Sequence, residues 1–163
     1  MYNPKTKPNV GKRIGATLID QAILWTLLYL FFKEFGTPNP EGGYSVTGFL
    51  SFIPIIIWFC FIVLPEFYYS STLGHKLLGL QVVSIEDINL KFSQVLKRRI
   101  CDIIEVIGFF GLLAFILVKN TKFNQRLGDI WAKTIVIDKA DPEQTNISFE
   151  FEEQTQLKSK NTW

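Results

Sequence analysis

Apolar residues are concentrated in three long stretches of the chain, separated by polar segments. The stretches cover residues 14–32, 49–69 and 100–118. A helix of about 19 residues rises roughly 28 Å, which is close to the thickness of the hydrocarbon layer of a bilayer. The pattern therefore predicts a mainly α-helical membrane protein. We expect a small bundle of two long membrane helices plus a third apolar segment.

The third stretch, 100–118, leaves two topologies open. Basic residues precede it at 97–99 and follow it at 119–126, and both flanks suit the cytoplasmic side. A straight crossing would place one basic flank outside. A re-entrant helical hairpin that turns at Gly108 and Gly111 would keep both flanks inside, if protein surrounds the irregular backbone.

Charge also predicts the orientation of the chain. The basic arm, residues 1–13, has four lysine or arginine residues and no acid, whereas loop 33–48 has two acids and one lysine at its edge. Basic segments remain on the cytoplasmic side of a membrane. We therefore expect the N terminus in the cytoplasm and loop 33–48 outside.

Two short β-branched segments predict a small cytoplasmic β element. Residues 79–85 are typical of a strand, and residues 134–137 could pair with them if both lie on the same side of the membrane. The membrane domain then covers residues 14–138. Residues 139–163 are polar and acidic, which predicts a disordered tail.

The composition supports this class of protein and disfavours others. Apolar residues make up 48% and aromatic residues 15% of the 163 residues, and the mean hydropathy is +0.20. A net charge of only +2 gives no field that would attract nucleic acid. We find no glycine-rich phosphate loop, nucleophile elbow or zinc-binding helix motif. The sequence therefore predicts no catalytic residues, metal or cofactor, and the protein is not expected to be an enzyme.

Charged residues inside apolar stretches are the candidate functional residues, because a carboxylate in hydrocarbon requires a partner or water. Asp20 lies in the first stretch, seven residues after Arg13 and on the same helical face. The two are about 10 Å apart along the axis, too far for a direct pair. We expect Asp20 to pair with water or with an arginine from another segment, namely Arg98, Arg99 or Arg126. Asp20 is then either a proton- or cation-binding carboxylate or part of a structural ion pair.

The remaining acids have their own interpretations. Glu66 follows Pro65 at a helix end and is expected in the headgroup region. Asp102 and Glu105 share a helical face, so they could share a proton or bind a cation, but Arg98 four residues earlier also predicts a helix-surface pair with Asp102. The candidate ion-binding or ion-pairing set is Arg13, Asp20, Glu66, Arg98, Asp102, Arg126 and Asp129.

Arg13 and Asp20 stand in the segment KRIGATLID, and Asp129 stands in NQRLGDIWAKTIVI. These segments resemble the RDD family of bacterial membrane proteins, which is named for one arginine and two aspartates. Arg13 and Asp20 fit the first two, Asp129 best fits the second aspartate, and Asp102 in RRICDIIE is another candidate. STLGHKLLGLQVVS is similar to the segment after the family's second helix, but His75 stands where a lysine is usual.

This resemblance implies a small multi-helix protein of the bacterial inner membrane, without a settled activity. One hypothesis is a membrane-embedded interaction or accessory subunit in which buried aspartate–arginine pairs fix the helices. The alternative is a transporter, with cation/proton exchange at Asp20. Because three segments are too few to enclose a gated path, the transporter would need to oligomerise. The expected partners are the lipid bilayer and a second copy or another membrane protein.

Overall fold

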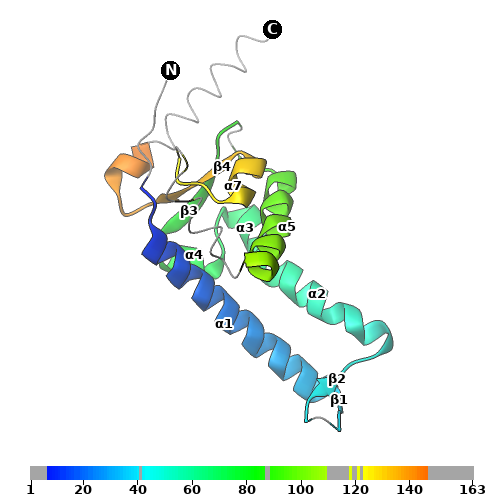
Figure 1. The fold of residues 1–163 in the computed structure, drawn as a ribbon. Coiled ribbons are helices and arrows are strands. Elements are labelled where there is room, and N and C mark those ends of the chain that lie inside the picture. Colours follow the sequence, from blue (N-terminus) through cyan, green and yellow to red (C-terminus); the bar gives the residue numbers. More distant parts are fainter. Residues whose placement is uncertain are drawn as a thin grey trace.

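The computed structural model describes residues 7–40, 42–86, 89–109, 118, 121 and 123–146, with the backbone alone described over 103–109. Figure 1 shows two long helical arms that leave a compact head. In chain order, the elements are α1 (Val10–Phe35), β1 (Thr37–Pro38), β2 (Tyr44–Ser45), η1 (Gly48–Phe52), α2 (Ile53–Trp58), η2 (Phe59–Val63), α3 (Leu64–Tyr69), α4 (Leu73–Leu77), β3 (Leu80–Ser84), α5 (Phe92–Phe109), α7 (Leu127–Ala132) and β4 (Thr134–Asp138).

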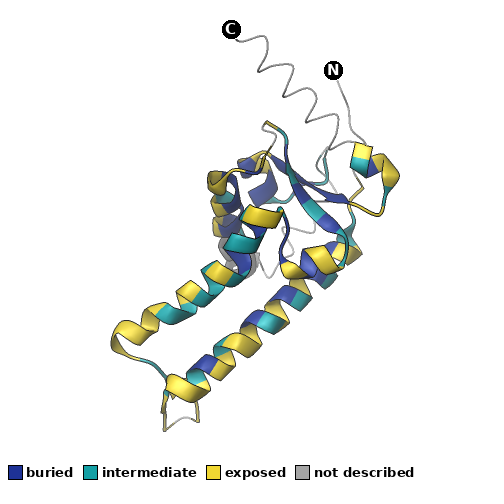
Figure 2. Ribbon diagram, turned by 180° about the vertical axis from the view of Figure 1, so that it is seen from behind, coloured by how far each residue is buried: buried dark blue, intermediate teal, exposed yellow. Residues whose placement is uncertain are grey.

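The two arms are long and apolar enough to cross a membrane. The first span is α1, Val10–Phe35, and the second span is the continuous helical run Gly48–Tyr69. Only 22% of the most apolar window of the first span and 11% of that of the second are buried within the chain. Figure 2 shows the consequence, since exposed residues cover most of both arms while buried residues gather in the head. The first helix begins at Val10, four residues earlier than the apolar pattern indicates.

Proline shapes the second span. Pro54 lies in the first turn of α2, where a missing N–H group costs no helical hydrogen bond. Pro65 lies two residues after η2, a π-helical turn over Phe59–Val63. A proline cannot donate to the carbonyl four residues before it, and its ring crowds that carbonyl, so the preceding turn widens. The helix therefore continues through Pro65 and carries Glu66 into the head.

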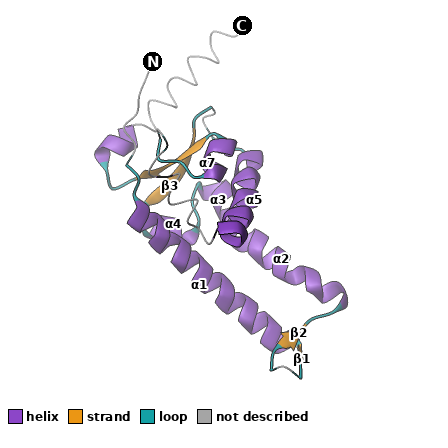
Figure 3. Ribbon diagram, in the orientation of Figure 1, coloured by secondary structure: helices purple, strands orange, loops and turns teal. Residues whose placement is uncertain are grey.

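The head contains the predicted β element. Strand β3 pairs with β4 in an antiparallel sheet, with Leu80 opposite Asp138 and Ser84 opposite Thr134 (Figure 3). This confirms the predicted pairing of the two segments. Buried side chains from α1, η2, β3, α5 and β4 meet beside this sheet, namely Ala16, Val63, Leu80, Val82, Val95 and Val136. A second, shorter hairpin, β1 with β2, joins the spans at the far end.

Part of the predicted disordered tail is folded. Residues 142–146 form a short helix, and Gln144 is fully buried. The Gln144 side-chain oxygen accepts hydrogen bonds from Asn9 Nδ2 and from the Asp138 backbone N–H. These amide contacts tie the segment to the start of α1, which the acidic composition alone did not indicate. Residues 147–163 lie outside the described residues, as do residues 110–117, on which the choice between a crossing and a hairpin depends.

Candidate functional site

The centre of the head is an ion pair between the second span and α5. Glu66, at the end of the second span, is fully buried. Arg98 Nε donates to Glu66 Oε1 at 2.6 Å, and Arg99 Nη2 donates to Glu66 Oε2. Each carboxylate oxygen therefore has its own guanidinium, an arrangement that offsets the cost of burying the charge. The prediction of a headgroup acid at Glu66 is wrong, because the helix continues past Pro65 and carries the carboxylate inside.

Asp129 forms the second buried centre of charge. It lies in the first turn of α7, is fully buried, and accepts from Arg98 Nη1 and from the backbone N–H of Arg126 at 3.1 Å. Arg13 Nη1, from α1, lies 3.4 Å from Asp129 Oδ2. Burial alone would raise the pKa of this carboxyl, but Arg98, Arg126 and Arg13 outweigh burial and hold the pKa below its ordinary value.

Asp102 closes these contacts into a ring. Its two oxygens lie 2.6 Å from Arg99 Nη1 and 3.3 Å from Arg126 Nη2. Arg126 Nε is 4.0 Å from Asp129 Oδ2, at the limit of an ion pair. We call this arrangement the ion-pair ring, and its members alternate in charge in the order Glu66, Arg98, Asp129, Arg126, Asp102 and Arg99.

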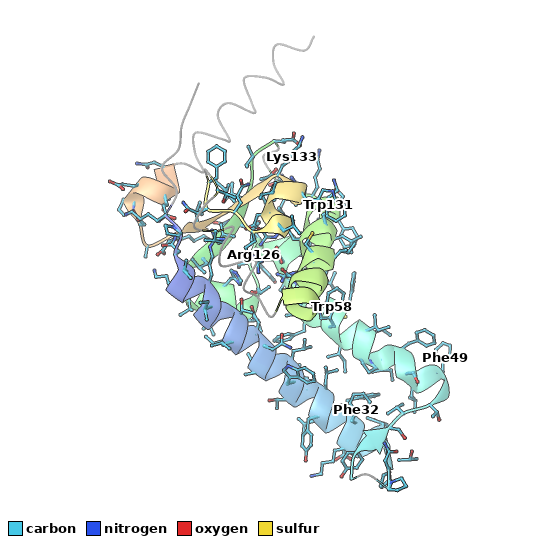
Figure 4. The ribbon with its side chains drawn as sticks, in the orientation of Figure 1. Phe32, Phe49, Trp58, Arg126, Trp131 and Lys133 are labelled. Carbon is cyan, nitrogen blue, oxygen red and sulfur yellow. The ribbon has the colours of Figure 1, made fainter. Side chains whose placement is uncertain are left out.

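Arg13 connects the ring to the first span and the sheet. Besides Asp129, it reaches the backbone of β4, where Nη2 donates to the Val136 carbonyl at 3.2 Å. The ring itself holds three arginines and three acids, so Arg13 adds one positive charge in excess. Figure 4 shows Arg126 in the middle of the head, between α1 on one side and α5 and α7 on the other. The ring and Arg13 therefore fasten four helices, α1, α3, α5 and α7, and strand β4 together.

Asp20 occupies a different environment, on α1 facing α4. Thr72 Oγ1 donates to Asp20 Oδ2 at 2.5 Å, and the Gly74 backbone N–H donates to Oδ1 at 2.7 Å. His75 Nδ1 lies 2.7 Å from Thr72 Oγ1 and 3.6 Å from Asp20 Oδ2. Because the single hydroxyl proton of Thr72 goes to Asp20, the geometry suits a proton on His75 Nδ1 that is donated to the hydroxyl oxygen. We call these four residues the Asp20 site.

Close packing of two helices creates this site. A Cβ atom on Gly74 would lie 2.2 Å from the Ala16 carbonyl oxygen and 2.9 Å from Asp20 Cγ. Only glycine allows α4 to approach α1 closely enough for its N–H to reach the carboxylate. His75 is buried, and burial lowers its pKa most, followed by the positive charges of Arg126 and Arg98, although Asp20 acts in the opposite direction. The imidazole is therefore held in its neutral form to lower pH than usual.

The structure divides the seven predicted residues between two places. Arg13, Glu66, Arg98, Asp102, Arg126 and Asp129 lie in or against the ion-pair ring, whereas Asp20 lies in its own site.

Two predicted pairings are wrong. The arginines expected to bind Asp20 instead pair with acids of the ring, while Asp20 accepts from Thr72 Oγ1 and from the Gly74 N–H at the start of α4. Asp102 pairs with Arg99 and Arg126, not with Arg98, whose guanidinium is turned toward Glu66 and Asp129. Glu105, the other acid of the proposed carboxylate pair, has a side chain outside the described ones.

Sequence reasoning also missed members of both sites. Arg99 was named only as a possible partner of Asp20, yet it bridges two acids of the ring. The sequence marks His75 only as a departure from the family's usual lysine, and it shows Thr72 only as part of the segment STLGHKLLGLQVVS. Thr72 is a usable signal, because a threonine before a short helix caps it, and the first N–H groups of a helix, such as that of Gly74, have no partner within the helix. Among the described residues, no group of three or more histidine, cysteine, aspartate or glutamate side chains could hold a metal ion.

Two exposed apolar arms on a head locked by buried ion pairs define a small helical membrane protein. Comparison with known proteins also indicates a membrane protein, and it identifies the family. The RDD family model matches residues 7–133, and the chain belongs to the RDD family. It is 28% identical over 133 residues, 77% of each chain, to the uncharacterized membrane protein YteJ of Bacillus subtilis (strain 168). No solved structure matches the chain.

Of the two candidates for the family's second aspartate, only Asp129 contacts Arg13 directly among the contacts described above. Arg13, which the sequence matches to the arginine of the family's name, and Asp129, the better-fitting aspartate, thus meet in space although they lie 116 positions apart. Asp20, matched from the sequence to the first aspartate of that name, lies on the same helix as Arg13 but serves the contact with α4. One helix therefore carries both the link to α7 and the link to α4.

Proposed function

We propose that this protein is a membrane-embedded interaction or accessory subunit that acts without catalysis. The observation that carries the proposal is the closed ion-pair ring. Each ring carboxylate is held by at least two guanidinium groups, so none is left to take up and release a proton or a cation. A ring of this kind suits a rigid head that holds two spans at a fixed spacing.

The surface available to a partner supports the same proposal. Trp25 is 62% exposed on the first span and Ile55 is 60% exposed on the second. Both are apolar, and both lie away from the head in the part of the chain that a bilayer would surround. Two spans with this little mutual burial leave room for another membrane protein or a second copy.

We also infer the placement of the chain. Lys7, Lys12 and Arg13 lie at the head end of the first span, whereas the β1–β2 hairpin at the far end belongs to segment 33–48, whose sequence contains Glu34 and Glu41 (Figure 1). By the positive-inside rule, the head then lies in the cytoplasm and the hairpin outside the bacterial inner membrane.

Photo-crosslinking from the first span tests the interaction proposal. A photoreactive residue in place of Trp25 should give one discrete crosslinked protein in native membranes, because this side chain is open to the membrane. The matched control places the same residue at Leu24, which is 7% exposed, and should give no crosslink to another protein. If Trp25 and Ile55 positions both react with lipid alone, the interaction proposal fails.

The Asp20 site favours a second candidate, cation/proton exchange by an oligomer. Its carboxylate is bound by a hydroxyl, an amide and a nearby imidazole, with no guanidinium among the contacts that define the site. Such a carboxylate can be protonated with a smaller loss of Coulomb energy than one between arginines.

Flux measurements test this candidate. Purified protein in liposomes with a trapped pH dye would receive sodium, potassium or lithium, and Asp20→Asn should abolish any cation-dependent flux while the protein stays folded. Asp138→Asn is the matched control, because Asp138 is also buried but pairs with Lys12 at the sheet edge. Absence of flux from folded wild-type protein would remove exchange by this chain alone.

A further inference from the structure

Helix α5 has its polar and apolar faces reversed relative to a helix of a water-soluble protein. Its buried face carries Arg98 and Arg99, while its outer face carries Phe92, Leu96 and Ile100, which are 41%, 37% and 41% exposed. The three apolar residues are spaced by four and form one stripe along the helix. A helix on the surface of a soluble domain would direct this stripe inward and its arginines outward. Something apolar must therefore face the outside of α5.

The stripe is continuous with the surface of the second span. The Phe92 ring meets Phe59 edge-to-face at 6.2 Å between centroids, and it meets Phe67 in the same way at 5.7 Å. Phe59 belongs to the second span itself. The apolar surface that the span presents to lipid thus passes onto α5 without a polar break at this junction.

Helix α7 extends the same surface at its other edge. Ile130 and Trp131 are 42% and 50% exposed, and Lys97 Nζ lies 5.8 Å from the centre of the Trp131 ring. Figure 4 shows Trp131 beside α5. Over residues 92–100 and α7, all of them described, Lys97 is the one charged side chain that is not buried. We call Phe92, Leu96, Lys97, Ile100, Ile130 and Trp131 the outer face.

A second aromatic–lysine pair occurs elsewhere on the head. Lys76 Nζ lies 5.0 Å from the centre of the Tyr69 ring, and the neighbouring Leu77 is 71% exposed. Tryptophan, tyrosine and lysine side chains gather at the level of lipid headgroups, because one end of each is apolar and the other is polar or charged. Two such pairs on the head are typical of a head that touches the membrane surface.

We propose that the outer face of α5 and α7 lies on the lipid surface of the same bilayer that the two spans enter. Acyl chains cover Phe92, Leu96 and Ile100, Trp131 lies at headgroup depth, and Lys97 binds lipid phosphate. Continuity with the second span favours lipid over a second copy of the chain, because no polar rim separates the two surfaces. This inference goes beyond the proposed function, and it stands whether the protein exchanges ions or binds a partner.

Spin-label accessibility in vesicles tests the inference. Cys60→Ala and Cys101→Ala remove the native thiols, Leu96→Cys receives a nitroxide, and the full chain is reconstituted in phosphatidylcholine vesicles. Collision rates with oxygen, which dissolves in lipid, are compared with those of a water-soluble nickel chelate. We expect a severalfold higher oxygen-to-nickel ratio at position 96 than at an aqueous reference position.

Two matched positions calibrate the measurement. Ile55→Cys, in the second span, is the lipid reference, and Glu86→Cys, whose native side chain is 51% exposed beside Lys133, is the aqueous reference. Trp131→Cys repeats the test on α7 should the label at position 96 disturb folding. A nickel-dominated ratio at both positions overturns the inference, and so does protection from both reagents, which would mean that protein covers the face.

Discussion

Asp129 and Asp20 are both buried aspartates of one head, yet their surroundings differ in kind. Asp129 lies among Arg98, Arg126 and Arg13, whereas Asp20 is held by Thr72 and the Gly74 amide, with His75 nearby. Guanidinium groups stay charged at any relevant pH, but hydroxyls, amides and imidazoles can adjust to a change in protonation. The comparison teaches that burial alone does not define a functional carboxylate. The partners decide whether it is fixed or titratable.

The largest expected effect is at Asp129. Asp129→Asn removes one acid from Arg13, Arg98 and Arg126 at once, and breaking a buried pair on one side costs about 3–5 kcal/mol. Chemical denaturation in mixed micelles would measure the loss in the free energy of unfolding. Glu86→Gln is the control, because its exposed pair with Lys133 contributes under about 1 kcal/mol. Equal effects at the two positions would contradict a structural role for the ring.

The next largest expected effect is the coupling free energy between Glu66 and Arg99, which are in direct contact in the ion-pair ring. Glu66→Gln and Arg99→Gln should each destabilise the protein, while the double variant should lose less than the sum. A coupling free energy of about 0.5–3 kcal/mol is expected for residues in direct contact. The same unfolding measurement on all four proteins of the cycle gives this value. Simple additivity would show that the contact between these two side chains adds nothing.

Gly74→Ala probes the Asp20 site without changing a charge. The added methyl group meets the Ala16 carbonyl and must push α4 away from α1, at a cost of about 1–3 kcal/mol. Gly11→Ala is the matched control on α1, where no atom lies within 4 Å of the new Cβ and alanine favours the helix. Thermal unfolding would separate the two variants, and a stable Gly74→Ala would refute the close approach of the helices.

The smallest expected effect is a pH dependence of the free energy of unfolding, which arises from His75 in the Asp20 site. The pKa of His75 is lowered in the folded state, so below its ordinary value of roughly 6.5 the unfolded chain binds a proton first. Stability should therefore fall as the pH drops through that value, by at most about 1.4 kcal/mol per pH unit for one proton. His75→Gln should remove this slope. Asp129, whose pKa is also lowered, loses its contribution only below roughly pH 4.

The parts of the fold that depend on local pattern could be predicted from the sequence. Both spans and the β3–β4 pairing follow from runs of apolar or β-branched residues, which signal their structure within a few turns. The choice of partners could not be predicted in the same way. The burial of Glu66 depends on Arg98 of α5, which lies 32 residues later in the chain, so the local sequence indicates a surface position instead. The partners of Asp20 likewise depend on the close packing of α4 on α1, because its donors lie 52 and 54 residues later in the chain, and no local pattern shows this packing.

The long sequence separation between Arg13 and Asp129 also sets the order in which the spans and the head assemble during synthesis. Arg13 binds Asp129, which is 116 residues further along the chain. At about 5–20 residues per second, the ribosome needs roughly 6–23 seconds to supply that partner after Arg13 is made. During this interval the spans can insert, but the head cannot close, because its last acid and strand β4 do not yet exist. Assembly therefore proceeds from membrane insertion to head closure, and in a nascent chain that stops before Asp129 the contact that joins α1 to α7 cannot form.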